Sequence, residues 1–375
     1  MTDLVVVSLE SWDRIWRRNQ HLVAGLLRTD PGLRVLFVEP SADPIHAAIH
    51  EHRATRGRGL RPGPDLGAGT AGRWWLHQPT KLLPRRIDPG SDRRWARGVA
   101  RVVRALRFED PLLWVNATQG SHLLELTGWP TLYDITDDWL LADRGDDERA
   151  RLVSEEAYLL THSEQVVVCS PRLQRDKKHA HQHLVPNAVE LAPYQENRRR
   201  PPDLPSGRTA LYVGTVHADR LDVAVTADTA RRLGRSGTVV LVGPQLLSAD
   251  DTRVLSEAGV LLLGGKDHDD VPAYLRHADV LLVPHVVTPF TDSLDPIKVY
   301  EYQAAARPVV STPVAGFRDL DDELVMIAEA ASFADTVART ITDPPEPRAH
   351  RPAPPTWQQR VAQMRAVVDA LGART

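Results

Sequence analysis

The sequence is poor in cysteine, and this excludes two classes of site. Cys169 is the single cysteine in 375 residues. A disulfide framework and a cysteine-ligated zinc site are therefore both excluded. The residue lies in the apolar run VVVCS, which favours a small buried hydrophobe.

Long apolar runs and a positive net charge are also missing. No window approaches the roughly 18 apolar residues of a membrane-spanning helix. The start, MTDLVVVSLESWD, lacks the basic stretch and longer apolar core of a secretory signal. A formal net charge of -3 gives no global positive field, which argues against a nucleic-acid-binding protein. We therefore expect a cytoplasmic protein without a nucleic-acid partner.

The most informative stretch is 278–311, ADVLLVPHVVTPFTDSLDPIKVYEYQAAARPVVS. Its apolar run at 280–283 predicts a parallel strand that is buried on both faces. A proline-containing loop follows, and good helix formers at 297–306 open just behind Pro296. A loop between a parallel strand and a helix N-terminus is where open α/β sheets bind anions and nucleotides.

The same stretch resembles the donor-binding signature of GT-B glycosyltransferases, in particular the GT4 group. The shared pattern is AD, four apolar residues, P, a loop, K-x-Y-E, a helix, and A-A-x-x-P-V-V-S. The resemblance implies that Glu301 holds the ribose hydroxyls of a nucleotide-sugar. Many members carry a second glutamate eight residues earlier, where this chain has Ser293. The alternative is an ordinary βαβ unit in which Lys298 and Glu301 form a solvated helix face.

The start of the chain predicts a second doubly wound domain. Apolar runs at 4–8 and 34–38 flank a helix at 20–27 with apolar residues at helical spacing. The loop between them, SWDRIWRRNQH, resembles the entry loop of bacterial GT4-like enzymes of cell-surface polysaccharide and natural-product pathways. That resemblance implies acceptor or donor contacts for Trp12, Arg18 and His21. In the alternative, the tryptophans pack against the helix and the arginines are solvated.

Two further segments carry clustered charge. Residues 54–73 are rich in glycine, proline and arginine and predict a mobile loop. The basic excess extends to residue 107, which suits an anionic membrane or an acidic acceptor, although a solvated arginine-rich surface is favoured. Aspartates follow a predicted strand at 131–135, at the functional edge of such a sheet. We expect Asp134 and Trp139 to contact the acceptor and Asp137 or Asp138 to accept its proton, unless one of the latter two caps a helix.

The resemblance covers nearly the whole chain and implies a GT-B fold. This α/β architecture has two doubly wound Rossmann-like domains facing a cleft, with a C-terminal helix that returns to the first. We place the acceptor-side domain at 1–188 with the helix 356–375, and the nucleotide-sugar domain at 189–355. The donor-binding residues implied by the family's loops are Gly214, Gly265, Lys266, Ser293, Leu294, Asp295, Pro296, Lys298 and Glu301. Arg220 and Lys298 are assigned to the diphosphate, in place of a pair that the family carries after the first strand of this domain.

The function that these motifs predict is transfer of a sugar from a UDP- or GDP-linked donor to a hydroxyl or amine acceptor. The expected acceptor is a small molecule or a lipid-linked sugar, with peripheral contact at the inner face of the membrane as a further prediction. No metal and no other cofactor are expected, because GT-B enzymes generally need none. Two alternatives remain open: a GT-B epimerase or phosphorylase, and a donor-binding protein without catalysis.

Overall fold

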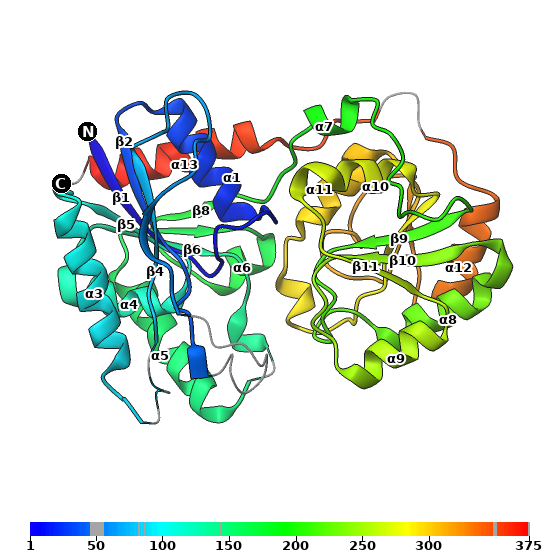
Figure 1. Cartoon of the computed structure of the whole chain (residues 1–375), viewed down its shortest axis with the longest axis horizontal. Coiled ribbons are helices and arrows are strands. Elements are labelled where there is room, and N and C mark those ends of the chain that lie inside the picture. The colour runs from blue at the N-terminus through cyan, green and yellow to red at the C-terminus, as the bar shows by residue number, and fades with distance from the viewer. Residues whose placement is uncertain are drawn as a thin grey trace. The chain divides into compact units, whose positions relative to one another are not determined.

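The computed structural model describes residues 1–45, 56–81, 83, 85, 87–142, 144–347 and 351–373. Contacts divide the chain into two compact units (Figure 1). Unit 1 contains Met1–Leu140, Arg144–Pro186 and Gln358–Thr375. Unit 2 contains Asn187–Trp357 and residues 141–143.

Unit 1 is built on an eight-stranded sheet in the order β3-β4-β2-β1-β5-β6-β7-β8. The strands are β1 (Thr2–Val7), β2 (Leu33–Val38), β3 (Gly59–Pro62), β4 (Trp74–Gln78), β5 (Leu112–Val115), β6 (Thr131–Ile135), β7 (Gln165–Val168) and β8 (Gln182–Leu184). All pairings are parallel except that of β3 with β4. The strand order reverses between β1 and β5, so their carboxyl ends form the edge where such sheets bind ligands.

Helices cover this sheet as the doubly wound pattern predicts. They are α1 (Arg18–Thr29), α3 (Ser91–Ala105), α4 (Ser121–Thr127), α5 (Asp146–His162), α6 (Pro171–Asp176) and α13 (Trp357–Gly372). The returning C-terminal helix is confirmed, because α13 packs directly on α1. A Cβ atom added to Gly25 of α1 would lie 2.2 Å from Cγ2 of Val361, so only a residue without a side chain fits this crossing.

The predicted mobile loop at 54–73 is wrong for part of its length. Residues 59–62 form β3, which pairs antiparallel with β4, while residues 54 and 55 lie outside the described part of the chain. Arg58 and Arg61 donate to the buried carboxylate of Glu39 at 3.0 and 2.6 Å. Glycine and proline suggested a loop, but an edge strand tolerates both, and the arginines compensate a buried charge.

Unit 2 has a six-stranded, all-parallel sheet in the order β11-β10-β9-β12-β13-β14. Its strands are β9 (Thr209–Val213), β10 (Thr238–Val242), β11 (Leu261–Gly264), β12 (Val280–Val283), β13 (Val309–Ser311) and β14 (Val325–Ile327). Its helices are α7 (Ala192–Gln195), α8 (Val223–Leu233), α9 (Ala249–Glu257), α10 (Val271–His277), α11 (Ile297–Ala305) and α12 (Ala330–Thr342). Here the strand order reverses between β9 and β12.

The two ends of unit 2 are hydrogen-bonded to each other. The amide of Val189 donates to the carbonyl of Pro355 at 3.0 Å, and the amide of Trp357 donates to the carbonyl of Val189 at 3.2 Å. An isolated parallel bridge joins Val189 to Thr356. The chain therefore enters and leaves this unit through two adjacent extended segments.

Burial of the sheets follows the sequence pattern. The run at 280–283 is fully buried, as expected for a parallel strand with helices on both faces. α11 ends at Ala305 and is capped by Ala306, which adopts the left-handed conformation with φ of 51° shortly before Pro308. Among the helices that the structure describes, none has the length and apolar character needed to cross a bilayer.

Candidate functional site

The loop between β12 and α11 lies at the point where the strand order of unit 2 reverses. The hydroxyl of Thr312 fixes the start of this loop by accepting from the amide of His285 at 3.2 Å and donating to its carbonyl at 2.7 Å. α11 begins directly after Pro296, so its free amides lie at the carboxyl edge of the sheet. This arrangement provides the helix N-terminus that the sequence predicted for an anion.

Lys298 lies in the first turn of α11, and its ammonium is enclosed by polar and aromatic groups. Nζ lies 3.1 Å from Nε2 of His285 and 4.0 Å from the ring centre of Tyr212. None of the carboxylates in the described residues forms an ion pair with it. Burial, together with the positive charge of Arg220, lowers the pKa of Lys298 well below its ordinary value. Within the part of the chain that the structure describes, this amine thus has no carboxylate in ion-pair contact, and only the charge of Glu301 opposes the lowering of its pKa.

His285 is a site residue that sequence reasoning missed. It is buried, and burial with the charges of Lys298 and Arg220 lowers its pKa well below the ordinary value. The ring is therefore neutral, and Nε2 can accept a hydrogen bond from the ammonium of Lys298 at 3.1 Å. Tyr212, which donates its hydroxyl to the carbonyl of Thr215 at 3.2 Å, completes the enclosure. In the sequence, nothing about a histidine that follows a buried strand indicated that it would contact Lys298 and Tyr212.

Glu301 follows Lys298 by three residues, so the two side chains share one face of α11. Burial raises the pKa of Glu301 to about 7, against the opposing effect of Lys298. Its carboxylate has no hydrogen-bond partner among the described residues. The adjacent Tyr302 anchors the helix, because its hydroxyl donates to the carbonyl of Leu282 and accepts from the amide of Val213. The carboxylate is thus rigidly positioned and available to a ligand.

Arg220 lies in the turn after β9, and its guanidinium lies 5.6 Å from the ring centre of Phe290. Its carbonyl accepts from the amide of Val286, which joins this turn to the loop before α11. It forms no ion pair among the described residues. Two cationic groups, Arg220 and Lys298, therefore act on the same region, each lowering the pKa of His285.

Glycines end the strands at this edge of unit 2. Gly214 and Gly243 have φ of 144° and 150°, which residues with a side chain rarely adopt. A Cβ atom at Gly243 would lie 1.9 Å from the carbonyl oxygen of Gly214, and one at Gly214 would lie 3.1 Å from Nζ of Lys298. Gly214 thus allows the ammonium of Lys298 to approach the end of β9.

The structure gives other predicted donor residues a bracing role. Ser293 is fully buried and donates its hydroxyl to the carbonyl of Phe290 at 2.7 Å. Leu294 is also buried, and the carboxylate of Asp295 accepts from the hydroxyl of Tyr300 at 2.8 Å. Direct contact of Ser293 and Leu294 with a donor sugar does not fit this conformation, because both side chains point into the protein.

The turn after β11 contains two predicted donor residues, Gly265 and Lys266. Gly265 is exposed. The ammonium of Lys266 donates to the carboxylate of Asp203 at 2.6 Å, and the hydroxyl of Tyr274 donates to the same group. Their assignment to the nucleobase stays a prediction.

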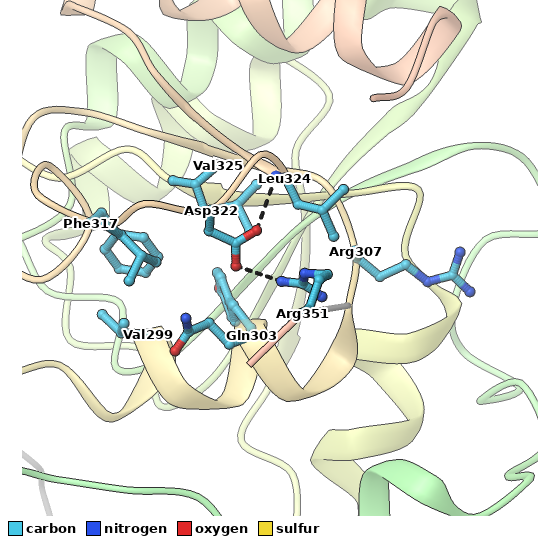
Figure 2. Close-up of a pocket in the computed structure, with 11 residues that line it drawn as sticks. Val299, Gln303, Arg307, Phe317, Asp322, Leu324, Val325 and Arg351 are labelled. Carbon is cyan, nitrogen blue, oxygen red and sulfur yellow. Dashed lines mark hydrogen bonds and ion pairs between the residues drawn. The ribbon is translucent and has the colours of Figure 1, made fainter. Parts of the chain in front are cut away.

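A separate pocket of unit 2 lies beside α11 (Figure 2). The helix contributes three lining residues, Val299, Tyr302 and Gln303. Their spacing of three and four residues places them on one face of α11, and this face does not include Lys298. At the pocket, Asp322 and Arg351 form an ion pair with each other.

In unit 1, two predicted acceptor residues bind each other. The guanidinium of Arg18 donates to the carboxylate of Asp134 at 3.2 Å, and Nε1 of Trp114 donates to it at 3.2 Å as well. Asp134 is fully buried, and Arg18 is 4% exposed. A direct contact of Asp134 with an acceptor is therefore wrong for this structure, since the carboxylate neutralises an internal guanidinium.

The predicted tryptophan contact is also mainly structural. Trp12 is 8% exposed and packs with ring centres 4.5 Å from Trp74 and 5.2 Å from Phe37. His21, in the second turn of α1, is buried with its ring centre 5.1 Å from that of Trp16. The alternative in which the tryptophans pack against the first helix therefore fits Trp16, whereas Trp12 packs against side chains of β2 and β4.

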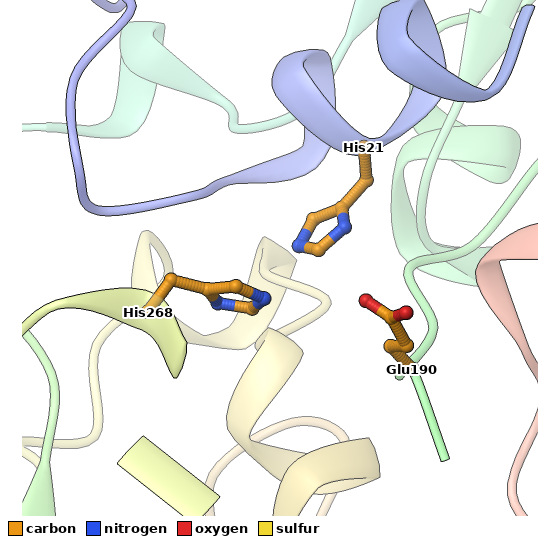
Figure 3. A group of neighbouring side chains, drawn as sticks. All are labelled: His21, Glu190 and His268. Atoms are coloured by element: carbon orange, nitrogen blue, oxygen red, sulfur yellow. The ribbon is translucent and has the colours of Figure 1, made fainter. Parts of the chain in front are cut away.

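Figure 3 shows His21 of unit 1 and, from unit 2, Glu190 and His268. Within unit 2, burial lowers the pKa of His268, and the carboxylate of Glu190 opposes this effect.

Asp137 and Asp138 have different surroundings. Asp138 is buried and accepts from the ammonium of Lys177 at 2.9 Å, and the same ammonium donates to Glu156 at 2.6 Å. Asp137 is half-buried, as is Trp139, whose ring lies under the guanidinium of Arg144 at 5.6 Å. Asp138 is buried against a cation, whereas Asp137 is partly exposed, so Asp137 is the better candidate for contact with an acceptor.

Comparison with known proteins finds a family match within unit 2. Residues 207–343 match the family model described as "Glycosyl transferases group 1". TuaH of Bacillus subtilis, described as a teichuronic acid biosynthesis glycosyltransferase, is 26% identical over 221 residues, which are 53% of this chain and 55% of TuaH. The match thus spans about half the length of that curated relative.

Solved structures resemble the whole chain at low identity. HepE of Anabaena, in complex with UDP and glucose, gives a TM-score of 0.60 at 13% identity and covers 92% of this chain and 90% of its own. A UDP-forming trehalose-phosphate synthase from Burkholderia vietnamiensis gives 0.60 at 15% identity, covering 100% and 99%. The chain therefore has the GT-B fold, and its residues 207–343 match the glycosyl transferases group 1 family model.

Proposed function

We propose that this protein is a GT4-like glycosyltransferase that transfers a sugar from a UDP-linked donor to a hydroxyl acceptor. Two groups on one face of α11 carry the proposal. Among the described residues, the ammonium of Lys298 has no carboxylate in ion-pair contact, and the carboxylate of Glu301 has no hydrogen-bond partner. An anionic diphosphate complements the first group, together with Arg220 and the helix amides. The ribose hydroxyls of a nucleotide complement the second.

In this proposal, catalysis rests on positioning and on neutralising the leaving diphosphate. Lys298 and Arg220 stabilise the negative charge that grows as the bond from the sugar to the diphosphate breaks, and His285 holds Lys298 in place. These protein groups supply the required positive charge, so we propose that transfer needs no metal ion. If the reaction inverts the anomeric centre, Asp137 accepts the proton of the acceptor hydroxyl.

We infer the acceptor class from TuaH, whose description names the synthesis of a cell-surface polymer. The proposed acceptor is the hydroxyl of a growing or lipid-linked glycan, which places the enzyme at the inner face of the membrane. Flotation of the protein with anionic vesicles tests this location. If the protein does not float with them, the remaining proposal is transfer to a water-soluble acceptor.

Calorimetry with UDP and GDP, combined with a turnover assay on the matching nucleotide-sugars, tests the proposed function. A transferase binds one of the nucleotides and consumes its sugar conjugate when an acceptor is supplied. Consumption that needs no acceptor and yields an isomeric nucleotide-sugar would indicate an epimerase, and phosphate-dependent release would indicate a phosphorylase. Tight binding without any turnover would indicate a donor-binding protein.

Replacing Glu301 by alanine is expected to weaken nucleotide binding by about ten- to a hundredfold. The loss corresponds to a charge-assisted hydrogen bond of about 1.5–3 kcal/mol, at about 1.4 kcal/mol per decade. Isothermal titration of UDP measures it, and Gln303→Ala on the same helix serves as the matched control. An unchanged affinity in Glu301→Ala would show that Glu301 does not bind the ribose.

Binding of a bare nucleoside is expected to strengthen as the pH rises through about 7, because Glu301 then becomes ionised. Uridine is the suitable probe, since it carries no phosphate that titrates in this range, and NMR titration measures its affinity. Glu301→Gln should abolish the dependence. The sign for stability is opposite: the raised pKa means that this group's contribution to stability falls as the pH rises from 4.5 toward about 7.

Asp137→Asn is expected to slow transfer about tenfold while sparing UDP affinity, because a carboxylate orients the acceptor hydroxyl better than an amide does. Asp138→Asn is expected to act mainly on stability, because it leaves Lys177 with one fewer carboxylate. Turnover numbers and melting temperatures of both variants separate the two roles. Wild-type turnover in Asp137→Asn would show that neither aspartate serves the acceptor.

A further inference from the structure

Three helices of unit 1 bring together a histidine and two carboxylates that the proposed transfer reaction does not use. Asp92 lies on α3, His122 on α4 and Glu155 on α5. Nε2 of His122 lies 3.4 Å from Oε1 of Glu155 and 4.0 Å from Oδ2 of Asp92. All three ligand atoms lie within 4.8 Å of one another. The group lies among helices that pack on each other, so its geometry is fixed by the fold.

One oxygen of Glu155 is buried, and its neighbouring donor among the described residues is the imidazole of His122 at 3.4 Å. Oε2 accepts from the hydroxyl of Thr118 at 2.6 Å and from Arg151 at 2.7 Å. Oε1 has no hydrogen-bond partner among the described residues, and the side chain is 4% exposed. Leaving a buried carboxylate oxygen without a partner is costly. This oxygen lies toward Nε2 of His122, so both atoms can bind one further group between them.

Asp92 keeps coordination capacity despite its own partners. Arg85 donates to both of its oxygens at 2.9 Å, and Gln119 donates to Oδ1 at 2.7 Å. An ionised carboxylate has about four lone-pair sites, so Oδ2 retains one. Arg85, Gln119, Thr118 and Arg151 hold the two carboxylates from outside, as the outer partners of metal ligands do.

The charge around this group also favours a cation. Besides Asp92 and Glu155, the carboxylate of Glu125 lies 4.0 Å from Nδ1 of His122, and Glu148 acts on Arg85. Four carboxylates thus face two guanidinium groups, those of Arg85 and Arg151. In the free protein, the carboxylate of Glu155 raises the pKa of His122, and a bound metal ion takes the place of that proton on Nε2. With the imidazole then neutral, the balance is two negative charges, which one divalent ion cancels.

We propose that Asp92, His122 and Glu155 bind a divalent transition-metal ion of the zinc class, which links α3, α4 and α5. Imidazole nitrogen and carboxylate oxygen are ligands of zinc, with bonds of about 2.0–2.2 Å, so neighbouring ligands of a tetrahedral ion lie about 3.3 Å apart. The separations of 3.4 and 4.0 Å need small side-chain movements to reach this value. The site is structural and independent of the proposed sugar transfer.

Binding of Co²⁺ to the full-length protein tests the proposal, because its visible absorption reports coordination directly. Wild-type protein, first treated with a chelator, is expected to bind one Co²⁺, and Zn²⁺ should displace it and raise the melting temperature. His122→Gln should weaken binding about a hundredfold or more, at or beyond the 10–100-fold cost of losing an outer partner. His181→Gln, in the separate histidine-rich segment at 179–183, should bind Co²⁺ as wild type does.

A second measurement uses the unmodified protein, so it does not depend on the folding of a variant. Diethyl pyrocarbonate modifies accessible imidazoles, and the side chain of His122 is 26% exposed. Peptide mapping is expected to show that Zn²⁺ protects His122 while leaving His181 reactive. Equal modification of His122 with and without Zn²⁺, or the same Co²⁺ affinity in His122→Gln and wild type, would overturn the proposal.

Discussion

Replacing Lys298 by methionine is expected to make the free protein more stable and to lower its affinity for UDP by about a hundredfold or more. The ammonium is enclosed beside Tyr212 and His285, and no carboxylate of the described residues forms an ion pair with it. Enclosure costs a cation its hydration. Methionine keeps the long aliphatic side chain and removes the charge. Both effects therefore come from the same property of one residue.

The expected gain in stability is about 0.5–2 kcal/mol, as for other substitutions that relieve strain at a functional site. In a unit of this size it corresponds to a melting temperature higher by about 2–6 °C. Differential scanning calorimetry without nucleotide measures this, and titration with UDP and with uridine measures binding. The loss should be much larger for UDP than for uridine, because uridine has no phosphate.

Lys81→Met is the matched control, since that ammonium already has the carboxylate of Asp43 as a partner at 2.7 Å. It should leave UDP affinity unchanged and should not stabilise the protein. Equal losses for UDP and uridine in Lys298→Met would mean that Lys298 does not act on the diphosphate. A lower melting temperature in that variant would contradict the account of an uncompensated charge.

Replacing Lys177 by methionine is expected to destabilise unit 1 by about 3–5 kcal/mol, the cost of removing one partner of a buried ion pair. Lys177 is 7% exposed and is the shared donor to Asp138 and Glu156. Without it, two buried carboxylates repel each other. Burial already raises the pKa of Glu156 in the intact protein. Removing the ammonium of Lys177 should raise it further and favour the protonated form of Glu156.

Urea unfolding at two pH values tests this account. The deficit of Lys177→Met should be smaller at about pH 5 than at about pH 8, because protonation neutralises the carboxylates. Glu156→Gln in the same background should restore part of the lost stability. A deficit that is equal at both pH values would show that lost packing, and not charge, causes it.

The local pattern of the sequence predicted most of the secondary structure near the site. The run at 280–283, the helix after Pro296 and the spacing of Lys298 and Glu301 needed only neighbouring residues, and the structure has the strand and the helix there. α11 also orients both side chains to one face, since residues three apart on a helix are neighbours.

Partners distant in the sequence could not be predicted in this way. Arg18 and Asp134 are 116 residues apart, and Lys177 and Asp138 are 39 apart. A single sequence shows which residues carry charge but not which charges meet. For this reason Asp134 and Asp138 were predicted to serve the acceptor, while the structure pairs them with internal cations. His285 was missed because its role depends on Lys298 and Tyr212, which come from two other elements.

The two ends of unit 2 are hydrogen-bonded to each other, which affects how the unit is encoded in the gene. Val189 bonds to the segment at 355–357. Apart from residues 141–143, a single cut on each side therefore releases one continuous reading frame whose ends already lie next to each other. Such a frame can be cloned alone or exchanged as a block without designing a new linker. Recombination between related genes would likewise replace the segment 187–357 in a single event, whereas unit 1, assembled from both ends of the chain, would need two coordinated exchanges.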